Sequence, residues 1–441
     1  MARFFLAFSL KNAINFKACL SLNDKPIQSH YSVKYPQNTL RERLFKNQNK
    51  EILMTTDRNL FFCASLLIFL GVLMSYSLST YTTVVLYHYG EFHFFIRQLV
   101  SAIIGIVIMW GLSRVDPSKW FSRLGFFLLF IPPLLIIGMF FLPESLSSSA
   151  GGAKRWIRLG FFSLAPLEFL KIGFTFFLAW SLSRTFVAKE KANVKEELIT
   201  FVPYSVVFVA LAIGVGVLQN DLGQIVLLGA VLAVLLVFSG GSAHLFGLII
   251  SGAFAISVLA IVTSTHRILR LKLWWSNLQN SLFTLLPDRL ANALRISDLP
   301  ESYQVFHAGN AMHNGGLLGQ GLGLGQIKLG FLSEVHTDMV LAGIAEEWGF
   351  LGLCVCFILF SVLIVLIFRI ANRLKEPKYS LFCVGVVLLI SFSLVINAFG
   401  VGGIFPVKGL AVPFLSYGGS SLLANCIAIG LVLSLARYTK G

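Results

Sequence analysis

The sequence predicts an all-α polytopic membrane protein. It would have about ten transmembrane helices, both termini in the cytoplasm and a long outer loop between spans seven and eight. The first observation is composition, because 56% of the 441 residues are hydrophobic and only 12% are charged. Soluble domains carry about twice that charged fraction. The second is that apolar runs of membrane-spanning length recur along the chain. The third is an uneven distribution of Lys and Arg among the connecting loops.

A membrane-spanning helix needs about 20 consecutive, predominantly apolar residues. Pro166 suits the first turn of a helix, so the fourth span is expected to begin there. The pair Pro132–Pro133 is expected to kink the third. The predicted spans are 58–79, 94–113, 121–142, 163–183, 199–218, 222–239, 243–264, 338–369, 379–399 and 409–436.

Basic loops orient the chain, because Lys and Arg close to span ends are retained in the cytoplasm. The loops after spans two, four and eight and the C-terminus are basic, and all fall on one side together with residues 1–53. We interpret 1–53 as a basic cytoplasmic tail, or as a misassigned start ahead of Met54, and 54–441 as the transmembrane domain. The net charge of +15 is therefore assigned to cytoplasmic Lys and Arg and not to nucleic-acid binding.

Two outer segments, the 143–162 loop and the long 265–337 loop, carry cations against this bias. Cations that stay outside indicate a phosphate-bearing partner at the outer face. The alternative is that they are ordinary surface charges. The candidate phosphate ligands in these two segments are Lys154, Arg155, Arg158 and Lys328. Lys408, in the last outer segment (402–421), is a further candidate.

Asp338 lies where the long outer loop meets the eighth span. Its carboxylate is either a general base in a partly hydrated cleft or a cap at the positive end of the helix. His336 is either a second proton carrier or a hydrogen-bond partner, and Glu334 is a further candidate substrate contact. His336 and Asp338 are two apart and no third ligand is evident, so no metal ligand set can be read from this stretch.

Five other charged residues are assigned structural roles. Glu346 and Glu347 lie two turns into the eighth helix, near the face of Asp338, and either line a cleft or pair with a cation. Glu168 and Lys171, three apart, can form an ion pair within the fourth helix. Asp221 lies in a tight turn, where it can cap the sixth helix.

The last outer segment, 402–421, is rich in Gly and Pro and contains Ser416 and Ser420 as candidate substrate contacts. Irregular backbone at membrane depth is tolerated only where it is buried in protein or lines a cavity. The glycines of 319–325 are similar to a phosphate-binding loop, but the Lys-Ser/Thr pair and the strand–turn–helix context are missing. Nucleotide binding there is therefore rejected.

Several stretches together resemble the SEDS family of peptidoglycan synthases. These are GGAKRWIRLG (151–160), PLEFLK (166–171), QNDLG (219–223), YQ (303–304), GGLLGQGLG (315–323), KLGFLSEVHTD (328–338), EEWGFLG (346–352) and PVKGLAVPFLSYGGSSLLAN (406–425). They follow the family's order within residues 58–437. The VKG before the final proline-rich stretch is more similar to the family's division members than to its elongation members.

The resemblance implies a peptidoglycan glycosyltransferase that polymerises lipid II, a disaccharide-pentapeptide on undecaprenyl pyrophosphate, into β-1,4 glycan at the outer face of the bacterial cytoplasmic membrane. Asp338 matches the family's essential aspartate, and the outer cations would hold the pyrophosphate. A divalent cation, Mg²⁺ or Mn²⁺, can share that task. The implied partners are a class B penicillin-binding protein, which is a transpeptidase, and other division proteins at the septum.

Two other functions remain open. About ten spans with an intramembrane ion pair also suit a lipid II flippase or another transporter of lipid-linked sugars. A non-enzymatic scaffold that recruits the transpeptidase predicts that Asp338 can be neutralised without loss.

Overall fold

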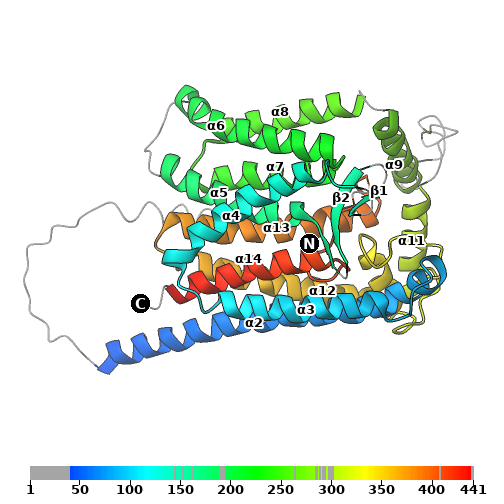
Figure 1. Ribbon diagram of the computed structural model, residues 1–441, viewed down its shortest axis with the longest axis horizontal. Helices are drawn as coiled ribbons and strands as arrows, with labels where there is room; N and C mark the ends of the chain where they lie inside the picture. The colour runs from blue at the N-terminus through cyan, green and yellow to red at the C-terminus, as the bar shows by residue number, and fades with distance from the viewer. Residues whose placement is uncertain are drawn as a thin grey trace, which may run out of the picture.

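The computed structural model describes residues 40–438, except for 144–145, 151–152, 161, 188–193, 263–264, 284–286, 288–289, 291–294, 296–301 and 407–408. Long helices run roughly side by side, and shorter elements gather at one end, on the right in Figure 1. The predictions for residues 1–39 and for Lys408 lie outside the described residues.

Each of the ten predicted spans corresponds to a helix. The helices are α2 (Leu40–Tyr81), α3 (His93–Leu112), α4 (Pro117–Gly138), α5 (Pro166–Thr185), α6 (Val194–Ile213), α7 (Leu222–Phe238), α8 (Ala243–Val262), α12 (Val340–Ala371), α13 (Pro377–Val401) and α14 (Gly419–Tyr438). Within the described residues, seven helices are long and apolar enough to cross a membrane, and α5, α7 and α8 are not among them. The chain is thus a multi-pass membrane protein, while ten crossings and the orientation of the termini stay predictions.

Helix α5 begins at Pro166, as predicted, with the proline in its first turn. It falls outside the seven candidate spans, and it carries three charged residues, Glu168, Lys171 and Arg184. Helix α4 contains both Pro132 and Pro133.

The structure corrects three expectations. The 143–162 segment is a small antiparallel sheet and not a simple loop, with β1 (Ser147–Ala150), β2 (Ala153–Leu159) and β3 (Phe162–Leu164) in that order. The last span begins at Gly419 and not at 409, because the preceding Gly- and Pro-rich residues form turns. Helix α2 begins at Leu40, so the end of the expected tail is helical.

Two helices, α9 (Thr265–Phe283) and α11 (Tyr303–Gly315), lie in the expected long outer loop. Figure 1 shows them beside the small sheet, at the same end of the bundle. This end also contains the residues immediately before α12. We refer to it as the outer end, after the predicted orientation.

Helices α5 and α13 form the centre of the bundle and are buried along most of their lengths. Small residues allow the neighbouring helices to approach closely, as is common where membrane helices pack. A Cβ atom at Gly173 of α5 would lie 2.2 Å from the carbonyl oxygen of Leu128 in α4. A Cβ at Gly105 of α3 would lie 2.7 Å from the sulfur of Cys426 in α14.

Gly173→Ala is expected to destabilise the protein by about 1–3 kcal/mol, because the added methyl group meets the rigid backbone of α4. The measurement is thermal unfolding of the purified protein in detergent. The matched control is Gly111→Ala in α3, where an added Cβ meets no atom within 4 Å. That substitution should be neutral or stabilising, since Ala favours helix over Gly. Equal loss of stability in Gly173→Ala and Gly111→Ala would show that close packing of α5 against α4 is not the cause of the destabilisation.

Candidate active site

Asp338 lies two residues before α12, at the outer end of the bundle. Met339, and not Asp338, occupies the N-cap position of this helix, and its side chain makes no capping hydrogen bond. The Thr337 hydroxyl lies 3.5 Å from Oδ1 of Asp338. Among the described residues, no Lys, Arg or His side chain forms an ion pair with this carboxylate.

Burial, and to a lesser degree the negative charge of nearby Glu334, raise the pKa of Asp338 to about 7. Hydrogen bonds from the Thr337 hydroxyl and from the backbone act in the opposite direction. Burial without a cationic partner disfavours the charged form of a carboxyl group. Asp338 can therefore exchange a proton near neutral pH, which a surface aspartate does not do.

The backbone around Asp338 is held by α13 and by the Gly- and Pro-rich segment before α14. The side-chain amide of Asn397 donates to the carbonyls of Asp338 (2.6 Å) and Leu410 (2.7 Å). A Cβ at Gly409 would lie 3.6 Å from Oδ2 of Asp338. Asp338 is thus held at its backbone by a side chain 59 positions further along the chain, and its carboxylate lies beside Gly409.

Sequence reasoning did not select Asn397. It is buried and lies in a predominantly apolar helix. A polar side chain within a membrane span is rare and usually functional or structural, and that signal could have identified it.

His336 is buried, with its ring stacked on Phe94 at a centroid distance of 5.4 Å and tilted against Tyr417 at 5.6 Å. Burial lowers the pKa of His336, so the ring is neutral at physiological pH. Its backbone carbonyl accepts a hydrogen bond from the N–H of Tyr417. These contacts favour the structural alternative for His336, in which the residue helps to position the turn that carries Asp338, and its candidate role in substrate binding stays a prediction.

Glu334 is exposed and adopts a left-handed backbone conformation with φ of 57°. Its carboxylate accepts a hydrogen bond from the Thr337 hydroxyl at 2.7 Å. The same hydroxyl is near Asp338, so two acidic groups share one turn. Glu334 thus remains available to a substrate at the surface of the site.

Ser416 and Ser420, predicted to contact substrate, instead hold backbone segments together. The Ser416 hydroxyl donates to the carbonyl of Thr337 and accepts from the N–H of Val412. The Ser420 hydroxyl donates to the carbonyl of Ser163 and accepts from the N–H of Ala165. Both side chains are buried, so the prediction of substrate contact is wrong for both.

Lys328 is also not an outward-facing phosphate ligand. Its amino group is buried and lies 2.6 Å from Oε1 of Glu347 and 3.0 Å from the carbonyl oxygen of Ser77 in α2. The prediction failed because the sequence could not show that residue 328 turns inward. Glu347 is predicted either to line a cleft or to pair with a cation, and the pairing is confirmed.

Glu346, adjacent to Glu347 in α12, also anchors the outer segment. Its carboxylate accepts from the backbone N–H groups of Gln326 (2.7 Å) and Ile327 (2.9 Å) and from the side chain of Asn314 (3.0 Å). The structural role proposed for Glu346 is therefore confirmed.

The glycine-rich residues 315–321 fit against an interruption in α12 at Gly349, where φ is 67°. The backbone N–H groups of Gln320 and Gly321 donate to the carbonyls of Glu346 and Glu347. In return, those of Phe350 and Leu351 donate to Gly316 and Leu317. The glycines thus serve backbone pairing, which is consistent with the rejection of a nucleotide site.

The basic residues of β2 differ in their surroundings. The guanidinium group of Arg155 donates to the carbonyls of Gln219 (3.0 Å) and Asn220 (3.1 Å) and lies 3.9 Å from Asp221. The amino group of Lys154 donates to the carbonyl of Leu142 at 2.8 Å. The side chain of Arg158 is exposed. Arg158 is consequently the residue of this group best placed to meet an external phosphate.

Asp221 accepts a hydrogen bond from the N–H of Gln224 at 3.2 Å, so the predicted cap of α7 is confirmed.

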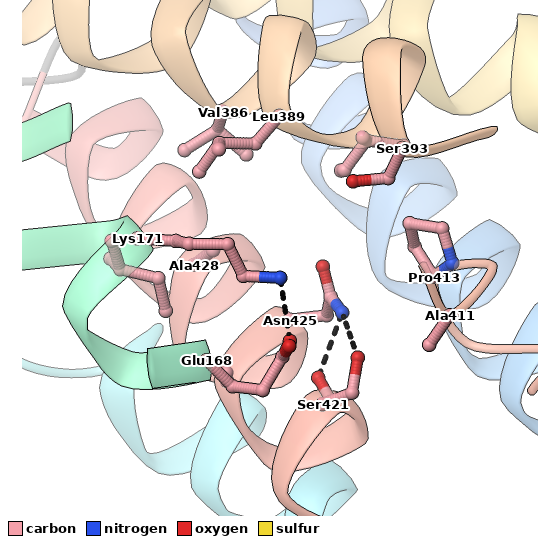
Figure 2. Close-up of a pocket in the computed structure, with 13 residues that line it drawn as sticks. Glu168, Lys171, Val386, Leu389, Ser393, Ala411, Pro413, Ser421, Asn425 and Ala428 are labelled. Atoms are coloured by element: carbon pink, nitrogen blue, oxygen red, sulfur yellow. Dashed lines mark hydrogen bonds and ion pairs between the residues drawn. The ribbon is translucent and has the colours of Figure 1, made fainter. Parts of the chain in front are cut away.

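Glu168 and Lys171 form the predicted ion pair, with 2.8 Å between Oε2 and Nζ. Figure 2 shows the pair beside Asn425, whose amide group donates to the backbone carbonyl of Ser421. The pair borders a cavity of about 20 Å³ between α5, α13 and α14. Ala411 and Pro413 close one side of it, so the cavity adjoins the segment that holds Asp338.

Among the described residues, no three His, Cys, Asp or Glu side chains are grouped so that they could hold a metal ion. Glu334 and Asp338 are two acidic groups whose carboxylates both lie near the Thr337 hydroxyl. Two carboxylates can bind Mg²⁺ when phosphate oxygens and waters complete its coordination.

Residues 57–441 match the FtsW/RodA/SpoVE family, described as cell cycle proteins. The chain belongs to this family. The match covers nearly all of the described structure and confirms the resemblance inferred from the motifs. It includes both Asp338 and the segments that hold it.

Two relatives of the FtsW/RodA/SpoVE family are similar over nearly their whole lengths. A protein of Helicobacter pylori strain 26695, named as a probable peptidoglycan glycosyltransferase FtsW, is 98% identical over 88% of this chain and 100% of its own. A protein of the same name from Trichlorobacter lovleyi is 33% identical over 84% of this chain and 90% of its own.

Solved structures share the fold. The rod shape determining protein RodA of Thermus thermophilus has a TM-score of 0.57 at 23% identity, covering 87% of this chain and 97% of that one. A chain from a peptidoglycan synthase complex, described as coordinating polymerisation and crosslinking, has a TM-score of 0.63 at 22% identity, covering 86% and 97%.

Lys328→Met is expected to destabilise the protein by about 3–5 kcal/mol, because it leaves the Glu347 carboxylate buried without its cation. The double variant Lys328→Met/Glu347→Leu should recover most of this loss. Thermal unfolding in detergent measures both.

The matched control is Lys378→Met, which breaks the more exposed ion pair with Glu376. It should cost less than about 1 kcal/mol. A double variant as unstable as Lys328→Met would contradict the assignment of the loss to an unpaired buried charge.

Proposed function

We propose that this protein is a peptidoglycan glycosyltransferase that polymerises lipid II at the outer face of the bacterial cytoplasmic membrane, with Asp338 as the general base. The observation that carries the proposal is the half-buried carboxylate of Asp338, which has no ion-pair partner among the described residues. Its pKa of about 7 suits a group that must accept a proton at neutral pH. The names of the similar proteins support the same activity.

In the proposed reaction, Asp338 accepts the proton of the acceptor sugar hydroxyl as that oxygen attacks the anomeric carbon of the lipid-linked donor. The bond from this carbon to the pyrophosphate oxygen breaks, and undecaprenyl pyrophosphate leaves. Displacement inverts the anomeric centre and yields the β-1,4 linkage. The turn held by Asn397 and Ser416 keeps the base in place, so little reorganisation is needed during proton transfer.

Exposed Arg158 and the outer-segment residue Lys408 are the proposed pyrophosphate ligands, because a cation stabilises the negative charge that develops on the leaving group. Arg155 and Lys154 are assigned to support of the small sheet. A divalent cation held by Glu334 would supply further charge neutralisation for the pyrophosphate, with Asp338 left free as the base.

The protein is proposed to act with a class B penicillin-binding protein, so that new glycan is crosslinked as it forms. The fold shared with a chain of a peptidoglycan synthase complex supports this partner. The similarity to proteins named FtsW supports action with other division proteins at the septum.

A lipid II transporter is the second candidate, and the Glu168–Lys171 pair beside an internal cavity is the observation that favours it. A cavity of about 20 Å³ has room for about one water molecule. A disaccharide headgroup would need a much larger passage. The geometry therefore favours the enzyme, and the scaffold alternative is left to the Asp338 test.

Asp338→Asn should reduce polymerisation of labelled lipid II by about 10²–10⁴-fold, because the amide cannot accept the proton. The assay uses the purified protein with its transpeptidase partner and a drug that blocks only classical transglycosylases.

The control is Asp221→Asn, which alters an acidic helix cap that, among the described residues, makes no hydrogen bond or ion pair with the turn carrying the proposed base and should retain activity. Full activity of folded Asp338→Asn would exclude Asp338 as the base, whereas neither polymerisation nor translocation of lipid II by the wild type would leave the scaffold. Translocation of lipid II by vesicles, without polymerisation by the wild type, would establish the transporter.

The polymerisation rate should rise with pH through about 7, since only the ionised form of Asp338 can accept a proton. Glu334 raises the pKa of Asp338 through its negative charge. Glu334→Gln should therefore lower that pKa and displace the rise to lower pH. The measurement is the pH dependence of the polymerisation rate at saturating lipid II. A rise at the same pH in both proteins would show that Asp338 does not control this step.

A further inference from the structure

A second and larger cavity, of about 710 Å³, lies at the end of the bundle opposite Asp338. It is formed where α3 meets α4, where α12 meets α13, and where α14 ends. The 32 residues of α12, at 1.5 Å each, separate the two ends by roughly 48 Å. This cavity is therefore independent of the proposed active site.

The charged residues that line the cavity are mainly basic. Four carry positive charge and two carry negative charge, giving a formal excess of two positive charges: Arg114, Arg373, Lys375, Arg437, Asp116 and Glu376. Both acidic groups already have partners, because Asp116 accepts from the N–H of Ser118 at 2.9 Å and Glu376 pairs with Lys378 at 2.7 Å. Neither carboxylate forms an ion pair with one of the four lining cations.

Arg373 provides the most specific indication of a missing anion. Its Nη1 atom is buried and has no hydrogen-bond partner among the described residues. Its Nη2 atom makes only a long contact of 3.4 Å to the hydroxyl of Thr56. Buried donors without partners are costly, and a guanidinium group is suited to bind two oxygens of a phosphate. Because Arg373 lines the cavity, a phosphate bound there would lie beside this guanidinium group.

Three tryptophan–arginine contacts lie at the same end of the bundle. The guanidinium carbons of Arg114, Arg123 and Arg184 lie 4.8, 5.7 and 4.1 Å from the ring centres of Trp110, Trp120 and Trp180, respectively. Tryptophan is enriched where a membrane meets water, at the level of the lipid headgroups. Figure 1 shows the nearby ends of α4, α13 and α14 meeting on the left. The cavity therefore lies at the depth of lipid phosphates.

We propose that this cavity binds the headgroup of an anionic phospholipid. Basic pockets between membrane helices are suited to anionic headgroups, and a position at the ends of the spans allows the acyl chains to remain in the bilayer. A zwitterionic lipid does not neutralise the excess positive charge. The bound phosphate links three inter-helix junctions, so it should stabilise the bundle.

The test compares the full chain in phosphatidylcholine nanodiscs with and without 20% phosphatidylglycerol, by thermal unfolding and by native mass spectrometry of retained lipid. Phosphatidylglycerol should raise the Tm of the wild type and remain bound. Arg373→Gln should weaken its binding by about fivefold, as expected for the loss of one cation near the membrane surface.

The matched control is Arg123→Gln, an exposed arginine at the same end that does not line the cavity. It should behave as the wild type does. Exposed Lys375 provides a second test, because Lys375→Gln removes a lining charge without disturbing buried contacts. It should also weaken retention even if Arg373→Gln fails to fold.

Three outcomes would overturn the proposal. The first is equal stabilisation by phosphatidylglycerol and phosphatidylcholine, and the second is equal lipid retention by Lys375→Gln and Arg123→Gln. The third is the same rise in Tm with 10 mM inorganic phosphate as with phosphatidylglycerol, which would identify a soluble phosphate compound and not a lipid as the ligand.

Discussion

The buried ion pair between Lys328 and Glu347 connects the outer segment to the membrane bundle. It joins the residues before Asp338 to α12 and, through the carbonyl of Ser77, to α2. The adjacent Glu346 accepts hydrogen bonds from two backbone N–H groups of the same segment. A buried charge is tolerated only where its partner and hydrogen bonds are in place. The conformation of the chain leading to Asp338 therefore depends on these two adjacent glutamates.

That attachment explains how a turn outside the helices can hold a catalytic group precisely. Asn397 and Ser416 bind the backbone of the turn from the opposite side. The carboxylate of Asp338 is consequently half-buried without meeting a cation, and its pKa rises. The same packing that fixes the position of the group thus also adjusts its chemistry. The position of Asp338 and its affinity for a proton therefore both follow from the packing of this turn.

The two ends of the bundle have opposite electrostatic character. Acidic Asp338 and Glu334 share a turn at the outer end, while arginines and a lysine surround the larger cavity at the other end. The first arrangement suits proton transfer and the second suits binding of an anion. The helices between them are closely packed around α5 and α13, so each end can be altered without direct contact with the other.

The sequence by itself determined the helices, the family and the features that depend on local spacing. Apolar run length fixed the ten helical segments, and Pro166 fixed the start of α5. The Glu168–Lys171 pair and the cap by Asp221 also followed, because residues three apart on a helix are necessarily neighbours. Asp338 could be selected because a carboxylate beside a span is unusual.

Only the tertiary structure decided which groups are buried and what they contact. Lys328 meets Ser77 across 251 positions, and Ser420 meets Ser163 across 257. No local pattern specifies such pairs, since they depend on how distant helices pack. The sequence thus identified polar groups that must be satisfied, and the fold determined which of them were left free to meet a substrate.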